Sequence, residues 1–596
     1  FSRLHGRGSF EGEDDFLGKA EEAGLRRSHP RAATFARLFQ QVKGLPRHIG
    51  QHPGGMVIAQ GMLDAVVPLE NAAMPGRSVI QWDKDDCEEL GIVKVDLLGL
   101  GMMAAIQDSL SDARRRGRPV DLAHLPKDDP ATFDLLCEAD TIGVFQVESR
   151  AQMATLPRML PRKFYDLVIE VAIIRPGPIV GELTNPYLER RAGRQPVDYI
   201  HSDLEPVLKR TLGVPLFQEQ VLRMAMMMAD FSGSEAEELR RALNFSRSPE
   251  RLMRVQGKLR RALEEKGHAP EVVERLTESV GSFALYGFPE SHAISFALLA
   301  YASAYLKVHR TAEFYAGILN NQPMGFYSPS TLVQDARRRG IRFLPVSACH
   351  SDWNVTVVDD CTLRIGFRLL GEVSRKAVRQ LLAERERASF VSLPDFLRRV
   401  KLTNRERRRM ALSGAFNEWA GDRRTALWKA GDEWANSSVE DGFDDLPFVE
   451  GERVSLPPMT LAERIEADYA SCGLTAGDHP MAMVRGSLDG VWKSSELERG
   501  AQNAMVKVAG AVICRQRPGT AKGVVFVSLE DEAGVANLIV YPDCYARFRM
   551  TLIEEPFLLV RGRIQKERGV VHVIVEELSR LDVGGSLPEE ASHDFH

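Results

Sequence analysis

The segment GIVKVDLLGLG, residues 91–101, places a lysine and an aspartate two positions apart in an otherwise apolar run. The run predicts a buried strand, in which alternation puts Lys94 and Asp96 on the same face. Buried charge costs free energy unless it is paired, hydrogen-bonded or bound to a metal ion. Two interpretations are open. One is a buried Lys94–Asp96 ion pair. The other is a carboxylate that helps to hold divalent ions for phosphoryl chemistry, which needs several such carboxylates.

A second candidate is the pair of adjacent arginines in SGSEAEELRRAL, residues 232–243. Ser234 followed by Glu237 matches a capping box, so we expect a helix to begin there. Helical periodicity turns the apolar residues inward and leaves Arg240 and Arg241 projecting away from the core. Two fixed guanidinium groups suit a triphosphate, because each can bind two oxygens. An exposed basic turn is the alternative interpretation.

In two further segments, the sequence predicts a fixed backbone conformation that carries one polar side chain of interest. In IIRPGPI, residues 173–179, prolines on both sides of a glycine stiffen a turn that presents Arg175 in a fixed direction. In YGFPESHAISFA, residues 286–297, His292 follows the expected cap residue Ser291 at a helix start. Aromatic side chains beside this histidine could stack on a base. A purely structural histidine is the alternative.

Residues 363–416 have the pattern of a phosphate-binding helical module. They contain two short helix pairs with glycine turns at Gly371 and Gly414, next to basic helices. Backbone N–H groups at such turns and helix starts bind phosphates without reading the base sequence. We therefore expect a contact with nucleic acid at these turns.

Residues 505–577 are expected to form five strands, with one helix between the third and the fourth. This is the element order of an OB-fold, whose ligands include single-stranded nucleic acid and oligosaccharide. Arg515 and Lys522 lie around the first hairpin, at the edge where such folds bind ligands. A protein ligand at this edge remains an alternative.

The elements that carry these residues belong to a chain of 596 residues, which predicts about three to five domains. Hydrophobic residues make up 44% and charged residues 27%, and the net charge of −5 argues against a uniformly basic surface. No apolar run reaches the ~18 residues of a membrane span. The seven cysteines form no CxxC pair, so neither a zinc site nor a disulfide framework is expected. A cytoplasmic location fits best.

Taken together, these segments resemble the bacterial C-family DNA polymerases of the polymerase III alpha-subunit type, over essentially the whole chain. The motifs, in the order of that family, are HIGQHPGGMVIAQG (48–61), QWDKDDCEELGIVKVDLLGLG (81–101), GVFQVESRAQM (143–153), RPGP (175–178), FQEQV (217–221), LRRAL (239–243) and YGFPESHA (286–293). Two segments resemble its damage-inducible, error-prone branch, namely NQPMGFYSP (321–329) and GTAKGVVFVSLEDEAGVANLIVYP (519–542).

The resemblance implies a multidomain α+β fold. The expected parts are the end of a thumb (1–45), the second segment of a palm (46–101), mostly helical fingers (102–345), a helix-hairpin-helix module (346–430), a linker region (431–500), an OB-fold (501–580) and a C-terminal tail (581–596). The last residues of the tail, SHDFH, are expected to be disordered.

The activity implied by the resemblance is that of a DNA-directed DNA polymerase, a nucleotidyltransferase that copies a template with dNTPs. On the error-prone branch it would act in DNA repair and translesion synthesis. Asp96 matches the third metal-binding aspartate of a palm that holds two Mg²⁺ ions, and Lys94, Arg240, Arg241 and His292 match residues that contact the incoming dNTP. The alternatives are the main replicative alpha subunit and a non-catalytic nucleic-acid-binding scaffold.

The resemblance also implies partners. Primer–template DNA would be bound with the help of Arg175, Gly371, Arg515 and Lys522, and single-stranded DNA at the OB-fold. No clear clamp-binding motif occurs in 417–470, so we expect the sliding clamp to be reached through an accessory mutagenesis protein.

One departure from the family concerns catalysis. No PDxDxDF-like motif, which carries the other two palm aspartates, occurs in the sequence. The order of the family's parts places that motif upstream of Phe1. We therefore expect residues 1–596 to be inactive alone.

Overall fold

The structure is a computed structural model that divides the chain into two compact units, residues 1–100 with 596 and residues 101–595. It describes residues 29–42, 55–72, 76–97, 99–174, 184–244, 249–283, 288–431, 456–517, 523–567, 569–583 and 593–595, with Leu17, Gly18, Glu21 and Ala521. Within these residues no helix has both the length and the apolar content of a membrane span.

The first unit contains two small antiparallel sheets. Strand β4, which carries Lys94 and Asp96, pairs with β1, and β2 pairs with β3. Val57 lies opposite Lys94, and Gly55 lies opposite Asp96. The described elements of this unit are α3 (Ala32–Val42), β1 (Gly55–Ile58), β2 (Leu69–Asn71), β3 (Ser78–Ile80), α4 (Lys84–Glu89) and β4 (Val93–Asp96).

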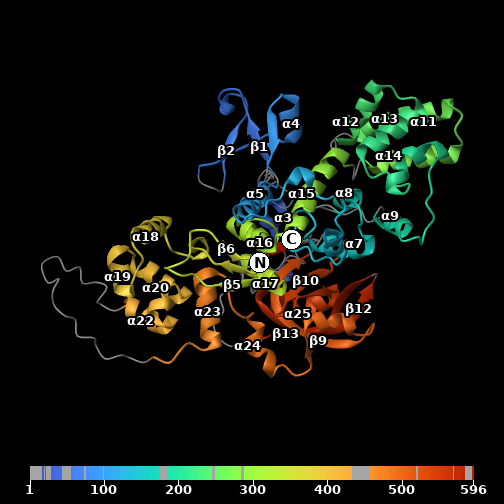
Figure 1. The fold of residues 1–596 in the computed structure, drawn as a ribbon. Coiled ribbons are helices and arrows are strands. Elements are labelled where there is room, and N and C mark those ends of the chain that lie inside the picture. The colour runs from blue at the N-terminus through green and yellow to red at the C-terminus, as the bar shows by residue number, and fades with distance from the viewer. Residues whose placement is uncertain are drawn as a thin grey trace, which may run out of the picture. The chain divides into compact units, whose positions relative to one another are not determined.

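The second unit begins with a large helical region built around α15. Alanines 293, 297, 300 and 304 of this helix are fully buried, and such small side chains let the neighbouring helix α8 approach closely. Helices α11 to α14 share a separate apolar core, and Figure 1 shows them as one group. The helices are α5 (Leu100–Arg115), α6 (Pro130–Cys137), α7 (Arg150–Met159), α8 (Phe164–Ile173), α9 (Thr184–Arg191), α10 (Glu205–Leu208), α11 (Gln218–Ala229), α12 (Gly233–Asn244), α13 (Pro249–Glu265), α14 (Pro270–Phe283), α15 (Glu290–His309), α16 (Thr311–Asn320) and α17 (Pro329–Arg338).

A three-stranded sheet of order β5-β7-β6 and a group of short helices follow. Helix α20 ends at Gly414, whose φ of +87° suits a residue without a side chain. The expected helical module is confirmed here. Its elements are β5 (Arg342–Leu344), β6 (Thr356–Asp359), β7 (Thr362–Arg364), α18 (Arg375–Arg387), α19 (Leu393–Arg399), α20 (Asn404–Ser413), α21 (Asn417–Ala420) and α22 (Arg423–Gly431).

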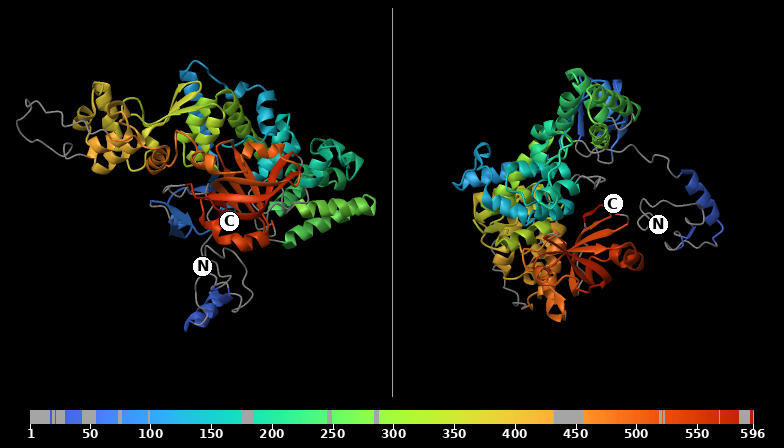
Figure 2. Two further views of the ribbon diagram at one scale, coloured as in Figure 1. Left: turned by 90° about the horizontal axis from the view of Figure 1, so that it is seen from below. Right: turned by 90° about the vertical axis from the view of Figure 1, so that its right-hand side faces the viewer.

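The predicted OB-fold is confirmed: residues 505–580 form a barrel near the C-terminus. Strands β9 to β13 run in the order β10-β11-β13-β12-β9, and pairing of β10 with β9 closes the barrel. Helix α25 lies between the third and fourth strands, as expected; Figure 2 shows this barrel in orange to red. The elements are β9 (Met505–Gln516), β10 (Val525–Glu530), β11 (Val535–Val540), α25 (Pro542–Glu554), β12 (Phe557–Glu567) and β13 (Val570–Arg580).

Two stretches differ from the expectation of little structure. Within the expected linker region, α23 (Leu461–Cys472) packs against α20, and β8 (Val491–Trp492) adds a parallel strand to β9. Ile465 and Tyr469 of α23 are buried, so α23 is an amphipathic helix that packs one face against the protein. At the C-terminus, the expected disordered tail instead contains β14 (His593–Phe595), a parallel partner of β9.

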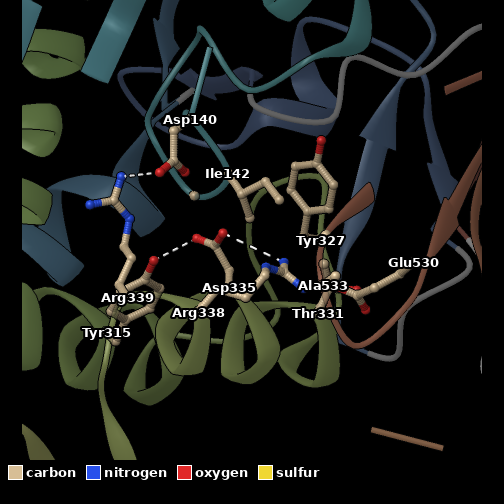
Figure 3. Close-up of polar contacts among 12 residues, drawn as sticks. Asp140, Ile142, Tyr315, Tyr327, Thr331, Asp335, Arg338, Arg339, Glu530 and Ala533 are labelled. Carbon is tan, nitrogen blue, oxygen red and sulfur yellow. Dashed lines mark hydrogen bonds and ion pairs between the residues drawn. The ribbon is translucent and has the colours of Figure 1, made fainter. Parts of the chain in front are cut away.

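A buried polar cluster lies where α15 ends. The Lys307 side chain is fully buried, and its Nζ lies 2.9 Å from Asp335 Oδ2 and 2.8 Å from the carbonyl oxygen of Ile142. Tyr315 donates its hydroxyl to the same carboxylate (Figure 3). Burial opposes ionisation of Asp335, but Lys307 and Arg338 hold its pKa below the usual range.

The same cluster joins the helical region to the barrel. Arg338, next to Asp335 on α17 (Figure 3), donates to Oε1 of Glu530 at 3.0 Å. Glu530 is the last residue of β10 and is 2% exposed. A buried charge pair therefore helps to position the barrel on the helices.

Candidate functional site

The arginine pair lies on α12, which begins at a different residue from the one expected. Ser232, not Ser234, caps this helix: its N–H and its hydroxyl both donate to Oε2 of Glu235 at 2.8 Å. The predicted Ser234–Glu237 capping box is therefore wrong. Glu235 also pairs with Lys258 of α13. This contact between two helices stabilises an α12 that begins at Gly233.

Helical periodicity places the rest of α12 as expected. Leu239 and Ala242 are buried in the core of α11 to α14, whereas the side chains of Arg240 and Arg241 are 38% and 58% exposed. Both guanidinium groups bind Glu237. Arg240 does so through two nitrogens, at 2.8 and 2.7 Å, and Arg241 through Nε at 3.1 Å. Hydrogen bonds from these arginines hold the pKa of the Glu237 carboxyl at about 2.

Gln218, the first residue of α11, connects α12 with the start of α15. Its backbone N–H donates to the carbonyl oxygen of Phe288 at 2.9 Å, and its side-chain amide donates to the carbonyl oxygen of Arg240 at 3.3 Å. The structure therefore brings the backbone of the arginine pair close to the segment that leads into His292.

Helix α15 is capped by a residue far away in the sequence. It begins at Glu290, and Oε2 of Glu219 on α11 accepts the Glu290 N–H at 2.9 Å. The predicted cap Ser291 lies inside the helix, so this prediction is wrong. Tyr165 of α8 donates its hydroxyl to Glu290 at 2.7 Å, and burial together with this carboxylate raises the pKa of Tyr165.

His292 lies on the first turn of α15 and is exposed. Its ring packs edge-on against Phe288 and Phe296, with centroids 5.1 and 4.2 Å away. Aromatic neighbours are thus present, as the sequence indicates. A contact of His292 with a base or sugar stays a prediction.

The prediction that the strand with Lys94 and Asp96 is buried is wrong. Val93 is 57% exposed and Lys94 is exposed, because β4 belongs to a two-stranded sheet. The Asp96 side chain lies outside the described residues, so neither the predicted ion pair nor the predicted ligand is tested. Among the described side chains, no group of three His, Cys, Asp or Glu residues is placed to hold a metal ion.

The turn at Gly371 joins the helical module to α23. The Gly371 N–H donates to the carbonyl oxygen of Ser471 on α23 at 2.9 Å. Glu372, which follows it, binds Arg405 and Arg409 of α20. A phosphate contact at Gly371 stays a prediction, and Arg175 lies outside the described residues.

In the barrel, Arg515 bonds to the end of α25. It donates to the carbonyl oxygens of Leu552 and Glu555 at 2.6 and 2.8 Å, two of the acceptors that a helix C-terminus leaves unpaired. This gives Arg515 a role within the barrel, and its contact with DNA stays a prediction. Lys522 lies outside the described residues.

Arg150, at the start of α7, is a barrel contact that sequence reasoning missed. Its guanidinium donates to the carbonyl oxygens of Val527 on β10 and Leu538 on β11, both at 2.9 Å. It also lies 5.0 Å from the ring centre of Phe526. Strands two and three form the usual ligand face of an OB-fold, so α7 contacts part of that face. The only signal in the sequence is the Ser149 cap, which fixes the direction of Arg150.

We expect Arg150→Met to loosen this contact. Hydrogen bonds to a charged group contribute roughly 1.5–3 kcal/mol each, so hydrogen exchange in β10 and β11 should speed up at least about tenfold. Arg561→Met is the control, since Arg561 pairs with exposed Glu577 on the same barrel. Equal hydrogen-exchange rates in the two variants would show that the contact of Arg150 does not stabilise β10 and β11.

Comparison with known proteins identifies matching families for most of the chain. Residues 100–267 match the finger domain of the bacterial DNA polymerase III alpha subunit, and residues 6–99 match the domain described as the NTPase domain of that subunit. Residues 340–426 match a helix-hairpin-helix motif, and residues 506–581 match an OB-fold nucleic acid binding domain.

Curated relatives match along nearly the whole chain. An error-prone DNA polymerase of an Azoarcus species is 45% identical over 98% of the chain and 56% of the relative. Proteins of the same name from Anaeromyxobacter dehalogenans and Methylococcus capsulatus are 45% and 44% identical over 94% of the chain, which covers 51% and 56% of their lengths. The chain thus spans about half the length of these relatives.

Proposed function

Because the chain belongs to the bacterial DNA polymerase III alpha-subunit family, in its error-prone branch, we propose that the protein synthesises DNA on a template. The observation that carries this proposal is the 45% identity to error-prone DNA polymerases along 98% of the chain. The finger-domain match includes the arginine pair of α12. On this branch the synthesis serves DNA repair and mutagenesis after DNA damage, in the cytoplasm.

In the proposed reaction, the 3′-hydroxyl of a primer attacks the α-phosphate of a dNTP and pyrophosphate leaves. Catalysis of this kind consists mostly of positioning and charge stabilisation. Arg240 and Arg241 bind the triphosphate with Lys94, and His292 contacts the nascent base pair. The helix-hairpin-helix module and the OB-fold hold duplex and single-stranded DNA, and an accessory protein provides the contact with the sliding clamp.

Divalent ions, proposed to be Mg²⁺, stabilise charge on the transferred phosphoryl group when they are bound. Asp96 provides a carboxylate oxygen, the donor that Mg²⁺ prefers. Among the described side chains, no group of three His, Cys, Asp or Glu residues is placed to hold such an ion. The role of Asp96 is therefore proposed as that of one ligand in a larger set.

The proposal predicts that Arg240→Ala and Arg241→Ala each raise KM for the dNTP by about tenfold or more, because each removes charge-assisted hydrogen bonds. The measurement is steady-state primer extension by the full-length gene product. Arg275→Ala is the control, since Arg275 lies on α14 with the same 38% exposure as Arg240 but pairs with Asp198. No template-directed extension by the wild-type protein would overturn the proposal. Replicase-like accuracy would favour the alternative of a main replicative subunit.

A further inference from the structure

The arginine pair of α12 is bound by an acidic residue of its own helix. One carboxylate, that of Glu237, accepts three hydrogen bonds from Arg240 and Arg241. The contact with Arg240 is bidentate, with Nε and one terminal nitrogen each on a separate oxygen. This is the geometry in which a guanidinium binds a phosphate.

The other two carboxylates of α12 have different partners. Glu235 and Glu238 lie 3.0 and 3.5 Å from Nζ of Lys258, and so tie α12 to α13. Of the three acidic residues on this helix, only Glu237 contacts the arginines in the described structure. Its side chain is 44% exposed, so it can leave the arginines without breaking the core.

Glu237 occupies donors that a triphosphate can also use. Arg240 binds the carboxylate through Nε and one terminal nitrogen, and Arg241 through Nε. The Nε and terminal nitrogen on one edge of a guanidinium are among its five N–H donors, and they can also bind two oxygens of a phosphate. A carboxylate carries one negative charge, whereas a triphosphate carries several, so the triphosphate interacts more strongly with two guanidinium groups. Glu237 is ionised at neutral pH, as an exposed glutamate ordinarily is, so this competitor carries its full negative charge.

We propose that Glu237 holds Arg240 and Arg241 in the nucleotide-free protein and releases them when the triphosphate binds. This rests on the proposed function, in which these arginines bind the dNTP. Glu237 is then a positioning residue that keeps the arginines ordered at a cost in nucleotide affinity. Anions with little charge, such as single phosphates, displace it less readily than a triphosphate does.

The test compares Glu237→Gln with Glu238→Gln in the full-length gene product on primer–template DNA. Both variants remove one negative charge from the same helix, but only the first removes the competitor. We expect Glu237→Gln to lower KM for the dNTP at least about threefold relative to Glu238→Gln, with a larger change in KM than in kcat. The difference should shrink as the salt concentration is raised, since exposed charges are screened.

Glu237→Ala provides a second variant that removes both the charge and the hydrogen bonds while keeping helix propensity high. Glu237→Ala should also lower KM for the dNTP. The rate of hydrogen exchange in α12 should be the same in this variant as in Glu238→Gln. A KM that stays unchanged or rises in both Glu237 variants would overturn the inference, since Glu237 would then not compete with the nucleotide. If Arg240→Ala and Arg241→Ala leave KM unchanged, the proposed role of the arginines fails instead.

Discussion

Replacing Asp96 with asparagine in the full-length gene product is expected to lower primer extension on the order of a thousandfold, the scale seen when a group that stabilises transition-state charge is removed. Asn keeps the size of the side chain and the end of β4, but it cannot supply the negative charge that a divalent cation requires. Binding of primer–template DNA should stay within about twofold, because that contact depends on other parts of the protein.

The matched control for this prediction is Asp64→Asn. Asp64 is an exposed aspartate of the same unit, on a short 3-10 turn (Leu63–Ala65), and the substitution changes the charge identically. It should leave extension and DNA binding unchanged. Extension by the Asp96 variant at the rate of this control would show that Asp96 is not part of the catalytic site. A parallel loss of DNA binding would show a folding defect.

The second large effect is expected for Lys307→Met. Lys307 is fully buried, and its charge is balanced by Asp335, which is 4% exposed. Removing one partner of a buried ion pair typically costs about 3–5 kcal/mol. Without Lys307, Asp335 would lose its nearest cation and keep the longer contact with Arg338, at 3.6 Å. The measurement is chemical denaturation, followed by hydrogen exchange in α15 and α17.

The control is Lys209→Met, since the Lys209 side chain is 74% exposed and pairs with Glu205 at 3.5 Å on the surface. Exposed pairs contribute roughly 0–1 kcal/mol, so this variant should unfold close to the wild type. Adding Asp335→Leu to Lys307→Met should recover part of the lost stability, since the carboxylate that lost Lys307 is removed and Arg338 keeps its pairing with Glu530. A cost for Lys307→Met as small as for Lys209→Met would contradict the assignment of a buried ion pair.

The start of α12 shows why local sequence left a choice open. Both Ser232–Glu235 and Ser234–Glu237 have the spacing of a capping box, so the pattern alone could not select between them. Packing against α13 brings Lys258 to Glu235 and leaves Glu237 to the arginines. A contact between two helices decided which serine is the cap.

The start of α15 and the buried lysine show the same limit over longer distances. Glu219 caps α15 from 71 positions earlier in the chain. Lys307 stands out in the sequence as a charge among apolar residues, but its partner Asp335 lies on a different helix. A contact between residues that are far apart in the sequence produces no periodic pattern from which it could be predicted.

By itself, the sequence determined the features that depend on local periodicity and element order. The five strands and one helix of the OB-fold, the helices of the helix-hairpin-helix module and the outward direction of Arg240 and Arg241 follow from spacing alone. The tertiary structure decided which carboxylate binds the arginines, which residue caps α15 and how Arg150 contacts the barrel. The physical reason is that side-chain direction is set within one element, whereas hydrogen-bond partners are set by the packing of elements against one another.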